Sequence, residues 1–319
     1  NRGFDLFYGM KAGGRDYFYN EKKSDRPGDE RNLLLNDRQV KFEKYLTDAF
    51  SEKAVEFINE SSQPFMMYLA YNAVHTPMQA TDEDMAKFEG HPRQKLAAMT
   101  YALDRGVGTV IRGLKDSGKF DNTLIFFLSD NGGATTNQSS NYPLKGFKGN
   151  KFEGGHRVPY FVVWKNGIPA GKPYDGLVSS LDIFATAIDA ASISKTRNRL
   201  DGVSLLPYLK GKKGEPHKVL YWRKMDTRAI RSGDYKLIIT HGVDSVLYNI
   251  RRDPEEMNNL INKEPDLYRK LAKKLAKWEK NECIEPSWLE EGWRKITNRY
   301  HQQLMHNEIK TAQDLYKKK

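Results

Sequence analysis

Two segments of the chain place polar side chains directly after apolar runs. Asp130 and Asn131 follow the run "LIFFL" (124–128), and His75 follows the run "FMMYLA" (65–70). A carboxylate beside an amide offers two oxygen ligands of the kind that Ca²⁺ and Mg²⁺ bind. Ligands of open parallel sheets bind outside the carboxyl ends of the strands, which suits these positions. Asp, Asn and Gly are also common in plain turns, so a metal site and a simple turn both stay open.

A third segment, "YPLKGFKGNKFEGGHRVPYF" (142–161), combines cationic side chains with glycines. Lys145, Lys148, His156 and Arg157 all lie within it. A flexible, cation-rich loop that leads into a strand suits the binding of an oxyanion. A solvated loop is the alternative interpretation of this segment taken alone.

The elements around these segments predict an α/β fold. Apolar residues with helical spacing indicate helices that begin near Thr47 and that cover 93–115 and 179–191. Continuous apolar runs indicate strands that are buried on both faces, as in a parallel sheet. These runs cover 65–70, 124–128 and 160–164. Helices that alternate with strands at these lengths predict a mostly parallel sheet.

The pattern changes near residue 212. The segments "KVLYWR", "TRAIRS", "YKLIIT" and "SVLYNI" predict four short antiparallel strands, followed by a charged helix with Leu271 and Leu275 on its apolar face. We therefore predict three parts: an α/β domain over 1–212, an antiparallel-sheet subdomain with a packed helix over 213–283, and a helical or irregular tail over 284–319.

Composition limits the classes of function. The 319 residues carry a net charge of +11, and 39% of them are hydrophobic, which fits a globular protein. The basic charge suits a polyanionic or sulfated partner, although solvated lysine-rich helices would explain it as well. No nucleic-acid motif and no apolar stretch of membrane-spanning length is present, so neither partner is expected. Cys283 is the only cysteine, which excludes an internal disulfide and a cysteine-based zinc site.

The order and spacing of several segments resemble the type I sulfatases of the alkaline phosphatase superfamily. "SDNGG" together with the segment 141–159 is most similar to the branch of arylsulfatase B and N-acetylgalactosamine-6-sulfatase. The resemblance implies an alkaline-phosphatase-like α/β fold, in which helices sandwich a mostly parallel sheet and a four-stranded antiparallel sheet with a helix forms a small C-terminal subdomain. The matching segments are 3–9, 64–77, 102–133, 143–164, 201–211, 231–238 and 247–260.

The resemblance also implies roles for four residues. Asp130 and Asn131 look like two ligands of a Ca²⁺ ion, with Mg²⁺ as an alternative. Lys148 matches the lysine that holds a sulfate oxygen, and His75 matches the histidine at the ester oxygen. Such an arrangement is chemically coherent, because a general acid can neutralise the leaving oxygen while cations stabilise the sulfuryl oxygens.

Three further residues of the glycine-rich segment are expected to contact substrate. Lys145 stands where many relatives have arginine, so it keeps the charge but lacks the planar fork. His156 stands where relatives often have an aliphatic residue, and the alternative to a substrate contact is a satisfied loop histidine. Arg157 follows directly and is the third candidate.

The function implied by the resemblance is hydrolysis of a sulfate ester, on a sulfated carbohydrate such as a glycosaminoglycan or an algal-type polysaccharide fragment. The alternatives are a phosphate or phosphonate ester hydrolase of the same superfamily and a non-catalytic glycan-binding relative. Relatives of this kind are exported, to the periplasm or outside the cell, or lysosomal.

The family's nucleophile is a formylglycine made from Cys or Ser in a Cys/Ser-x-Pro/Ala-x-Arg motif. Residues 1–319 contain no such motif, and the sequence "CIEPSW" at Cys283 does not fit it. The expectation is therefore that the formylglycine belongs to an upstream segment. The chain would then need that segment to complete its fold and would be inactive without it.

Overall fold

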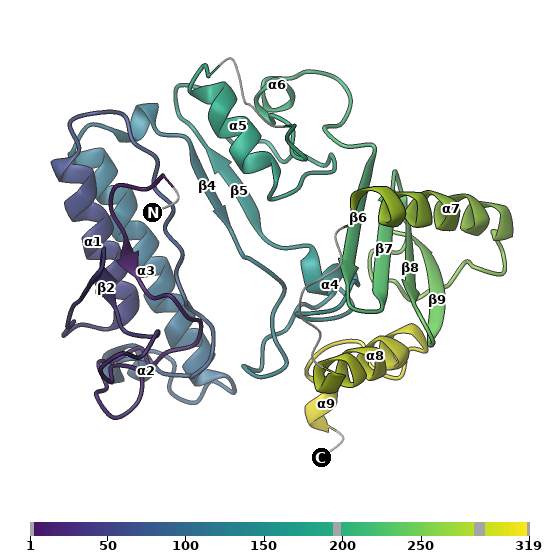
Figure 1. Ribbon diagram of the computed structural model, residues 1–319, viewed down its shortest axis with the longest axis horizontal. Helices are drawn as coiled ribbons and strands as arrows, with labels where there is room; N and C mark the ends of the chain where they lie inside the picture. Colours follow the sequence, from purple (N-terminus) through teal and green to yellow (C-terminus); the bar gives the residue numbers. More distant parts are fainter. Residues whose placement is uncertain (1–2, 194–198, 284–290, 318–319) are drawn as a thin grey trace. The chain divides into compact units, whose positions relative to one another are not determined.

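The computed structural model of the protein describes residues 3–193, 199–283 and 291–317. The chain divides into two compact units, residues 1–122 and 123–319, and each is considered by itself. In Figure 1 the first unit runs from purple to blue, and the second runs from teal to yellow. The predicted boundary near residue 212 stays a prediction. No helix in the described ranges combines the length and the apolar character needed to cross a membrane.

The first unit is built on two helices that pack together, α1 (Leu46–Glu60) and α3 (Gln94–Asp116). Both helices confirm predictions from helical spacing. The close approach of α1 and α3 depends on two glycines of α3. A Cβ on Gly106 would lie 2.6 Å from Ser51 Oγ, and a Cβ on Gly113 would lie 2.9 Å from a Val55 methyl group. The remaining elements are short: β1 (Tyr8–Gly9), β2 (Leu34–Leu35), β3 (Arg38–Gln39), α2 (Asp82–Ala86) and the 3₁₀ turn η1 (Phe120–Asn122).

The run 65–70 differs from its prediction as a strand buried on both faces. It has no strand partner among the described residues, and its side chains alternate between half-buried and exposed. Met66 and Tyr68 are 60% and 77% exposed, whereas Phe65 packs edge-on against Phe57. The run therefore forms no strand among the described residues, and the predicted burial on both faces is wrong.

In the second unit, β4 (Ile125–Leu128) pairs with β5 (Tyr160–Val163) in antiparallel register, with Ile125 opposite Val163 and Leu128 opposite Tyr160. Both strands were predicted, but a parallel arrangement was expected. Parallel neighbours need a crossover connection, usually a long helix. The chain between β4 and β5 instead forms loops and one helical turn, α4 (Glu153–His156). Two further helices follow: α5 (Asp182–Ala190) and α6 (Leu206–Leu209).

The predicted four-stranded antiparallel sheet is confirmed. It runs in chain order through β6 (Val219–Lys224), β7 (Thr227–Ser232), β8 (Tyr235–Thr240) and β9 (Asp244–Asn249). The charged helix that follows is α7 (Pro265–Glu282), and the tail contains α8 (Glu291–Met305) and α9 (Asp314–Lys317). Figure 1 shows α7 and α8 beside this sheet.

Strand alternation gives this sheet two apolar faces. Ile230, Leu237 and Leu247 pack against Leu271 and Leu275 of α7. The residues beside them in register face the other way, where Ala229, Ile238 and Val246 form a core with α8 and with two residues of the glycine-rich segment. Those two residues are Phe147 and Phe152, both fully buried. The sheet therefore supports the segment that was singled out for its cations.

Candidate active site

The turn after β4 is fixed by close backbone contact. The Gly132 N–H donates a hydrogen bond to the Gly155 carbonyl at 3.0 Å, and the Ser129 N–H donates to the Pro159 carbonyl at 3.3 Å. A Cβ on Gly132 would lie only 1.8 Å from the Gly154 carbonyl oxygen. Glycine is required here because the turn and the α4 segment touch through their backbones.

Asp130 and Asn131 lie at the start of this turn. Asp130 is exposed, and the Asn131 Nδ2 donates to its Oδ2 at 2.5 Å. Their hard oxygen donors fit Ca²⁺ or Mg²⁺ in kind, but Ca²⁺ takes six to eight oxygen ligands. Among the described residues, no three His, Cys, Asp or Glu side chains gather in a way that could hold a metal ion. Asp130 and Asn131 therefore supply two oxygen donors of the kind that such an ion binds, fewer than a full Ca²⁺ ligand set.

Lys148 is held next to this turn through its backbone. Its N–H donates to the Gly133 carbonyl at 3.0 Å, while its side chain is exposed. Asn141 fixes the same glycine, because its Oδ1 accepts from the Gly133 N–H at 2.7 Å and its Nδ2 donates to the Gly133 carbonyl at 3.2 Å. Asn141 also donates to the Gly146 carbonyl at 3.1 Å. The sequence singled out Lys148 and missed Asn141, whose role depends on loop geometry.

Lys145 lies on the inner side of the same loop and is fully buried. Its Nζ donates to the Glu256 carbonyl at 3.0 Å and to Asn307 Oδ1 at 2.5 Å. The ammonium also lies over the Phe152 ring, 5.0 Å from its centroid. Burial lowers the pKa of Lys145 to about 8, against the opposing charge of Glu256. Protein acceptors surround this ammonium, which favours a supporting role over a substrate contact.

A buried ion network joins α4 to the antiparallel sheet. Lys236 is fully buried, and its Nζ lies 2.8 Å from Glu153 Oε1 and 2.9 Å from Glu256 Oε1. The Glu153 N–H donates to Glu256 Oε2 at 2.6 Å. Burial raises the pKa of Glu256. At Glu153 burial acts in the same direction, but the nearby positive charges, led by Lys236, together with the hydrogen bond from Lys236 lower the pKa overall. The sequence analysis did not identify these residues, because they are separated along the chain and meet only in the fold.

His156 and Arg157 have different surroundings. The His156 ring stacks on Trp222, with centroids 4.5 Å apart, and its Nε2 lies 3.1 Å from the Lys151 carbonyl. Burial lowers the pKa of His156 to about 3, so the ring is neutral at physiological pH. The Arg157 side chain is 58% exposed, and its Nη1 lies 3.6 Å from Glu153 Oε2. Arg157 keeps its charge accessible, while His156 is held by protein neighbours.

His75 belongs to the first unit. Its side chain is exposed, and its Nδ1 lies 2.9 Å from the Thr76 carbonyl. Its backbone is fixed, because the Tyr17 hydroxyl donates to the carbonyls of His75 and Asn72 at 2.9 and 2.6 Å. The loop that carries the imidazole is therefore held by two hydrogen bonds to its backbone.

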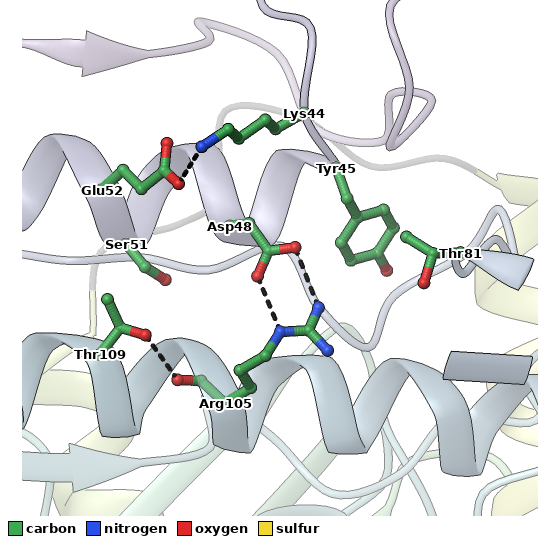
Figure 2. Close-up of a pocket in the computed structure, with 8 residues that line it drawn as sticks. All are labelled: Lys44, Tyr45, Asp48, Ser51, Glu52, Thr81, Arg105 and Thr109. Atoms are coloured by element: carbon green, nitrogen blue, oxygen red, sulfur yellow. Dashed lines mark hydrogen bonds and ion pairs between the residues drawn. The ribbon is translucent and has the colours of Figure 1, made fainter. Parts of the chain in front are cut away.

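The first unit also contains a polar pocket of about 420 Å³ between α1 and α3, shown in Figure 2. Its four charged side chains are already paired. Arg105 binds Asp48 at 2.9 Å, and Lys44 binds Glu52 at 2.5 Å. Arg105 also reaches Asp84 at 2.6 Å. Internal pairing leaves this pocket little charge for a ligand, so it is a weaker candidate than the loops of the second unit.

Two known families match the chain. The family described as Sulfatase matches residues 1–193. The family described as N-sulphoglucosamine sulphohydrolase, C-terminal, matches residues 148–281. Together the two matches cover residues 1–281, including the glycine-rich segment 142–161.

Individual relatives give the same result. The chain is 38% identical to "Uncharacterized sulfatase YdeN" of Escherichia coli (strain K12) over 232 residues, which cover 70% of this chain and 40% of the relative. It is 32% identical to N-acetylgalactosamine-6-sulfatase of Canis lupus familiaris over 202 residues, which cover 61% of this chain and 38% of the relative. The chain thus spans about two fifths of the length of these curated relatives.

A solved structure resembles the chain closely. The crystal structure of Ps i-CgsB in complex with k-i-k-neocarrahexaose superposes with a TM-score of 0.83 at 36% sequence identity. The match covers 94% of this chain and 71% of that one. The predicted alkaline-phosphatase-like α/β fold is therefore confirmed, with the antiparallel pairing of β4 and β5 as a correction in detail.

Proposed function

The chain belongs to the sulfatase family, and on that premise we propose that the protein hydrolyses a sulfate ester of a sulfated carbohydrate. One observation carries the proposal: the backbone hydrogen bond from Lys148 to Gly133 holds the backbone of a lysine with an exposed side chain beside the turn of Asp130 and Asn131. A sulfuryl group needs cationic partners for its oxygens, and this loop pair supplies one ammonium together with oxygen donors for a cation.

The proposed chemistry assigns one task to each group. As the S–O bond breaks, negative charge develops on the bridging oxygen, and His75 donates a proton to it. Lys148 stabilises the sulfuryl oxygens throughout this step. Membership of the sulfatase family implies a metal ion and a formylglycine. The metal ion would stabilise negative charge, and the formylglycine would supply the nucleophile. We propose Asp130 and Asn131 as two ligands of that metal, with Ca²⁺ as the ion.

The three other predicted residues receive different proposed roles. Lys145 supports the loop from within, because its ammonium is enclosed by Glu256, Asn307 and Phe152. Arg157 remains a proposed substrate contact, since its side chain is exposed. His156 is neutral and stacked on Trp222, so any contact with a sugar would be uncharged.

The proposed substrate is an oligosaccharide with sulfate esters. Ps i-CgsB binds k-i-k-neocarrahexaose, and the curated relative from dog is named for N-acetylgalactosamine 6-sulfate. Neocarra-oligosaccharides and sulfated N-acetylgalactosamine are therefore the first substrates to test. An exported or lysosomal location, predicted from the family resemblance, fits such substrates and stays a prediction.

We also propose that an upstream segment completes the fold. No formylglycine motif occurs in residues 1–319. In addition, Phe127, Phe161 and Val163 are 39%, 58% and 42% exposed on the β4–β5 pair, and they form an apolar face that a further layer of chain packed on it would bury. The chain alone is expected to be inactive.

Paired substrates test the proposed function. The complete natural gene product is assayed with an aryl sulfate, the matching aryl phosphate and a neocarra-oligosaccharide, before and after chelation of divalent metal. Sulfate release that requires metal supports the proposal. Preference for the phosphate would favour the phosphate or phosphonate ester hydrolase, and tight binding of the sulfated sugar without turnover would favour a glycan-binding relative.

A further inference from the structure

Three lysines of the second unit form a group that we call the lysine cluster: Lys148, Lys151 and Lys224. Lys148 and Lys151 lie on the loop before α4, and Lys224 ends β6. Within the described ranges no carboxylate pairs with any of the three. Lys236 on β8 contrasts with them, because two carboxylates lie within 3 Å of its ammonium.

The sheet register brings Lys224 to this loop. Trp222 and Lys224 are two positions apart on β6, so they share a face. That face contacts the loop, since Trp222 stacks on His156 of α4. The Lys224 Nζ lies 3.1 Å from the place where a Cβ on Gly149 would sit. Gly149 directly follows Lys148, so the end of β6 covers the loop that carries the other two lysines.

The cluster is not neutralised by its titratable neighbours. Burial and the charges of Lys224 and Lys236 lower the pKa of Lys151 to about 8. Burial and the charge of Lys148 lower the pKa of Lys224. The two imidazoles nearby are neutral, because burial lowers the pKa of His156 to about 3 and of His301 to about 4. Neither ring therefore offsets the positive charge of the lysines.

Uncompensated, half-buried cations cost stability unless a ligand supplies the opposite charge. A purely structural lysine would be expected to have a partner, as Lys236 has Glu153 and Glu256. The lysine cluster therefore has the character of a binding position for an oxyanion. Lys148 is already assigned to the sulfate that is cleaved, which leaves Lys151 and Lys224 without a role.

We propose that Lys151 and Lys224 bind a second sulfate group of the same oligosaccharide, next to the sulfate that Lys148 holds. The protein would then select chains in which two sulfates lie close together over chains with one. This inference rests on the proposed function for the assignment of Lys148, and it adds a substrate class to it.

Binding measurements test the inference separately from catalysis. The complete natural gene product is titrated with two labelled galactose oligosaccharides of equal length, one with a single sulfate and one with two sulfates. A third probe carries a uronate in place of the second sulfate. The variants are Lys151→Met and Lys224→Met, and the matched control is Lys274→Met, an exposed lysine on α7. Thermal unfolding of each variant verifies that it is folded.

The wild-type protein should bind the disulfated probe about tenfold more tightly than the monosulfated one, as expected for one desolvated charge-assisted contact. Lys151→Met and Lys224→Met should each remove most of that preference and leave monosulfated binding within about twofold. Lys274→Met should keep it.

Equal affinity of the wild-type protein for both probes would overturn the proposal, as would equal losses on both probes in the two variants. A uronate probe that binds as tightly as the disulfated one would overturn the assignment to sulfate. A failure to release sulfate would count against the proposed function alone, because these titrations do not depend on turnover.

Discussion

The Lys236 ammonium lies 2.8 Å from the Glu153 carboxylate, and both side chains are withdrawn from solvent. Glu153 opens α4, the turn that touches the Asp130 loop, while Lys236 belongs to the antiparallel sheet. The pair therefore links the candidate site to an element 83 residues further along the chain. Removing one partner of a buried ion pair leaves the other charge without compensation.

The first prediction concerns this link. Lys236→Met leaves the buried carboxylates of Glu153 and Glu256 without their shared cation, and it should lower the free energy of unfolding by about 3–5 kcal/mol. Chemical denaturation measures the change. Lys274→Met, on the exposed side of α7, is the control and should change stability by less than about 0.5 kcal/mol. A stability loss no larger than that of the control would show that the network contributes nothing.

The second prediction concerns Lys148. Lys148→Ala should reduce kcat/KM for a sulfate ester by about 10²–10³-fold, the usual effect of losing one preorganised donor in a transition state. Lys148→Arg should recover part of this loss, because it keeps the charge. Steady-state kinetics of the complete natural gene product provide the measurement. Unchanged kinetics in Lys148→Ala, with wild-type thermal unfolding, would remove Lys148 from the mechanism.

The third prediction concerns the turn after β4. Gly132→Ala would place a Cβ 1.8 Å from the Gly154 carbonyl oxygen, so the two backbones must separate. We expect a loss of about 1–3 kcal/mol of unfolding free energy, as for other overpacked positions. Gly13→Ala is the matched control, since a Cβ there meets nothing within 4 Å. Equal stabilities of the two variants would contradict the described contact.

The fourth prediction concerns pH and Lys151. Its pKa in the folded protein is about 8, below the usual value of 10.5. Between these pH values the unfolded chain binds more protons, so this residue makes the protein more stable as pH rises from 8 to 10.5. At pH 7 the penalty is fully present, and Lys151→Met should therefore be more stable than the wild-type protein.

Unfolding measurements at several pH values check this sign. The advantage of Lys151→Met should be on the order of 1–3 kcal/mol at pH 7 and should shrink towards pH 10.5. Lys145 also has a pKa near 8, but it is present in both proteins and cancels in the difference. A Lys151→Met variant that is less stable at pH 7 would mean that a partner neutralises Lys151 in the folded protein.

The residue spacing within short segments was enough to predict individual helices and strands. The helical spacing of Leu96, Met99 and Leu103 predicted α3, and short strand-like segments separated by tight turns predicted the four-stranded sheet. Whether two strands pair in parallel or antiparallel fashion depends on the chain that connects them. The antiparallel pairing of β4 and β5 follows from a loop that turns back, which an apolar run cannot specify.

The candidate site shows the same division. Asp130, Asn131 and Lys148 could be singled out because residue type and family spacing identify them. Burial could not be read in the same way: Lys145 and Lys148 are three residues apart in one loop, yet one is fully buried and the other exposed. The partners of Lys145 come from 111 and 162 residues further along the chain, and no local pattern indicates such separations.

The network of Glu153, Lys236 and Glu256 also limits how such proteins can recombine. An exchange between two relatives with a crossover after β5 would take Glu153 from one parent and Lys236 and Glu256 from the other. If the parents have different residues at these positions, the hybrid inherits a buried charge without its complement. Viable chimaeras should therefore inherit the cation-bearing loop and the C-terminal sheet as one genetic block.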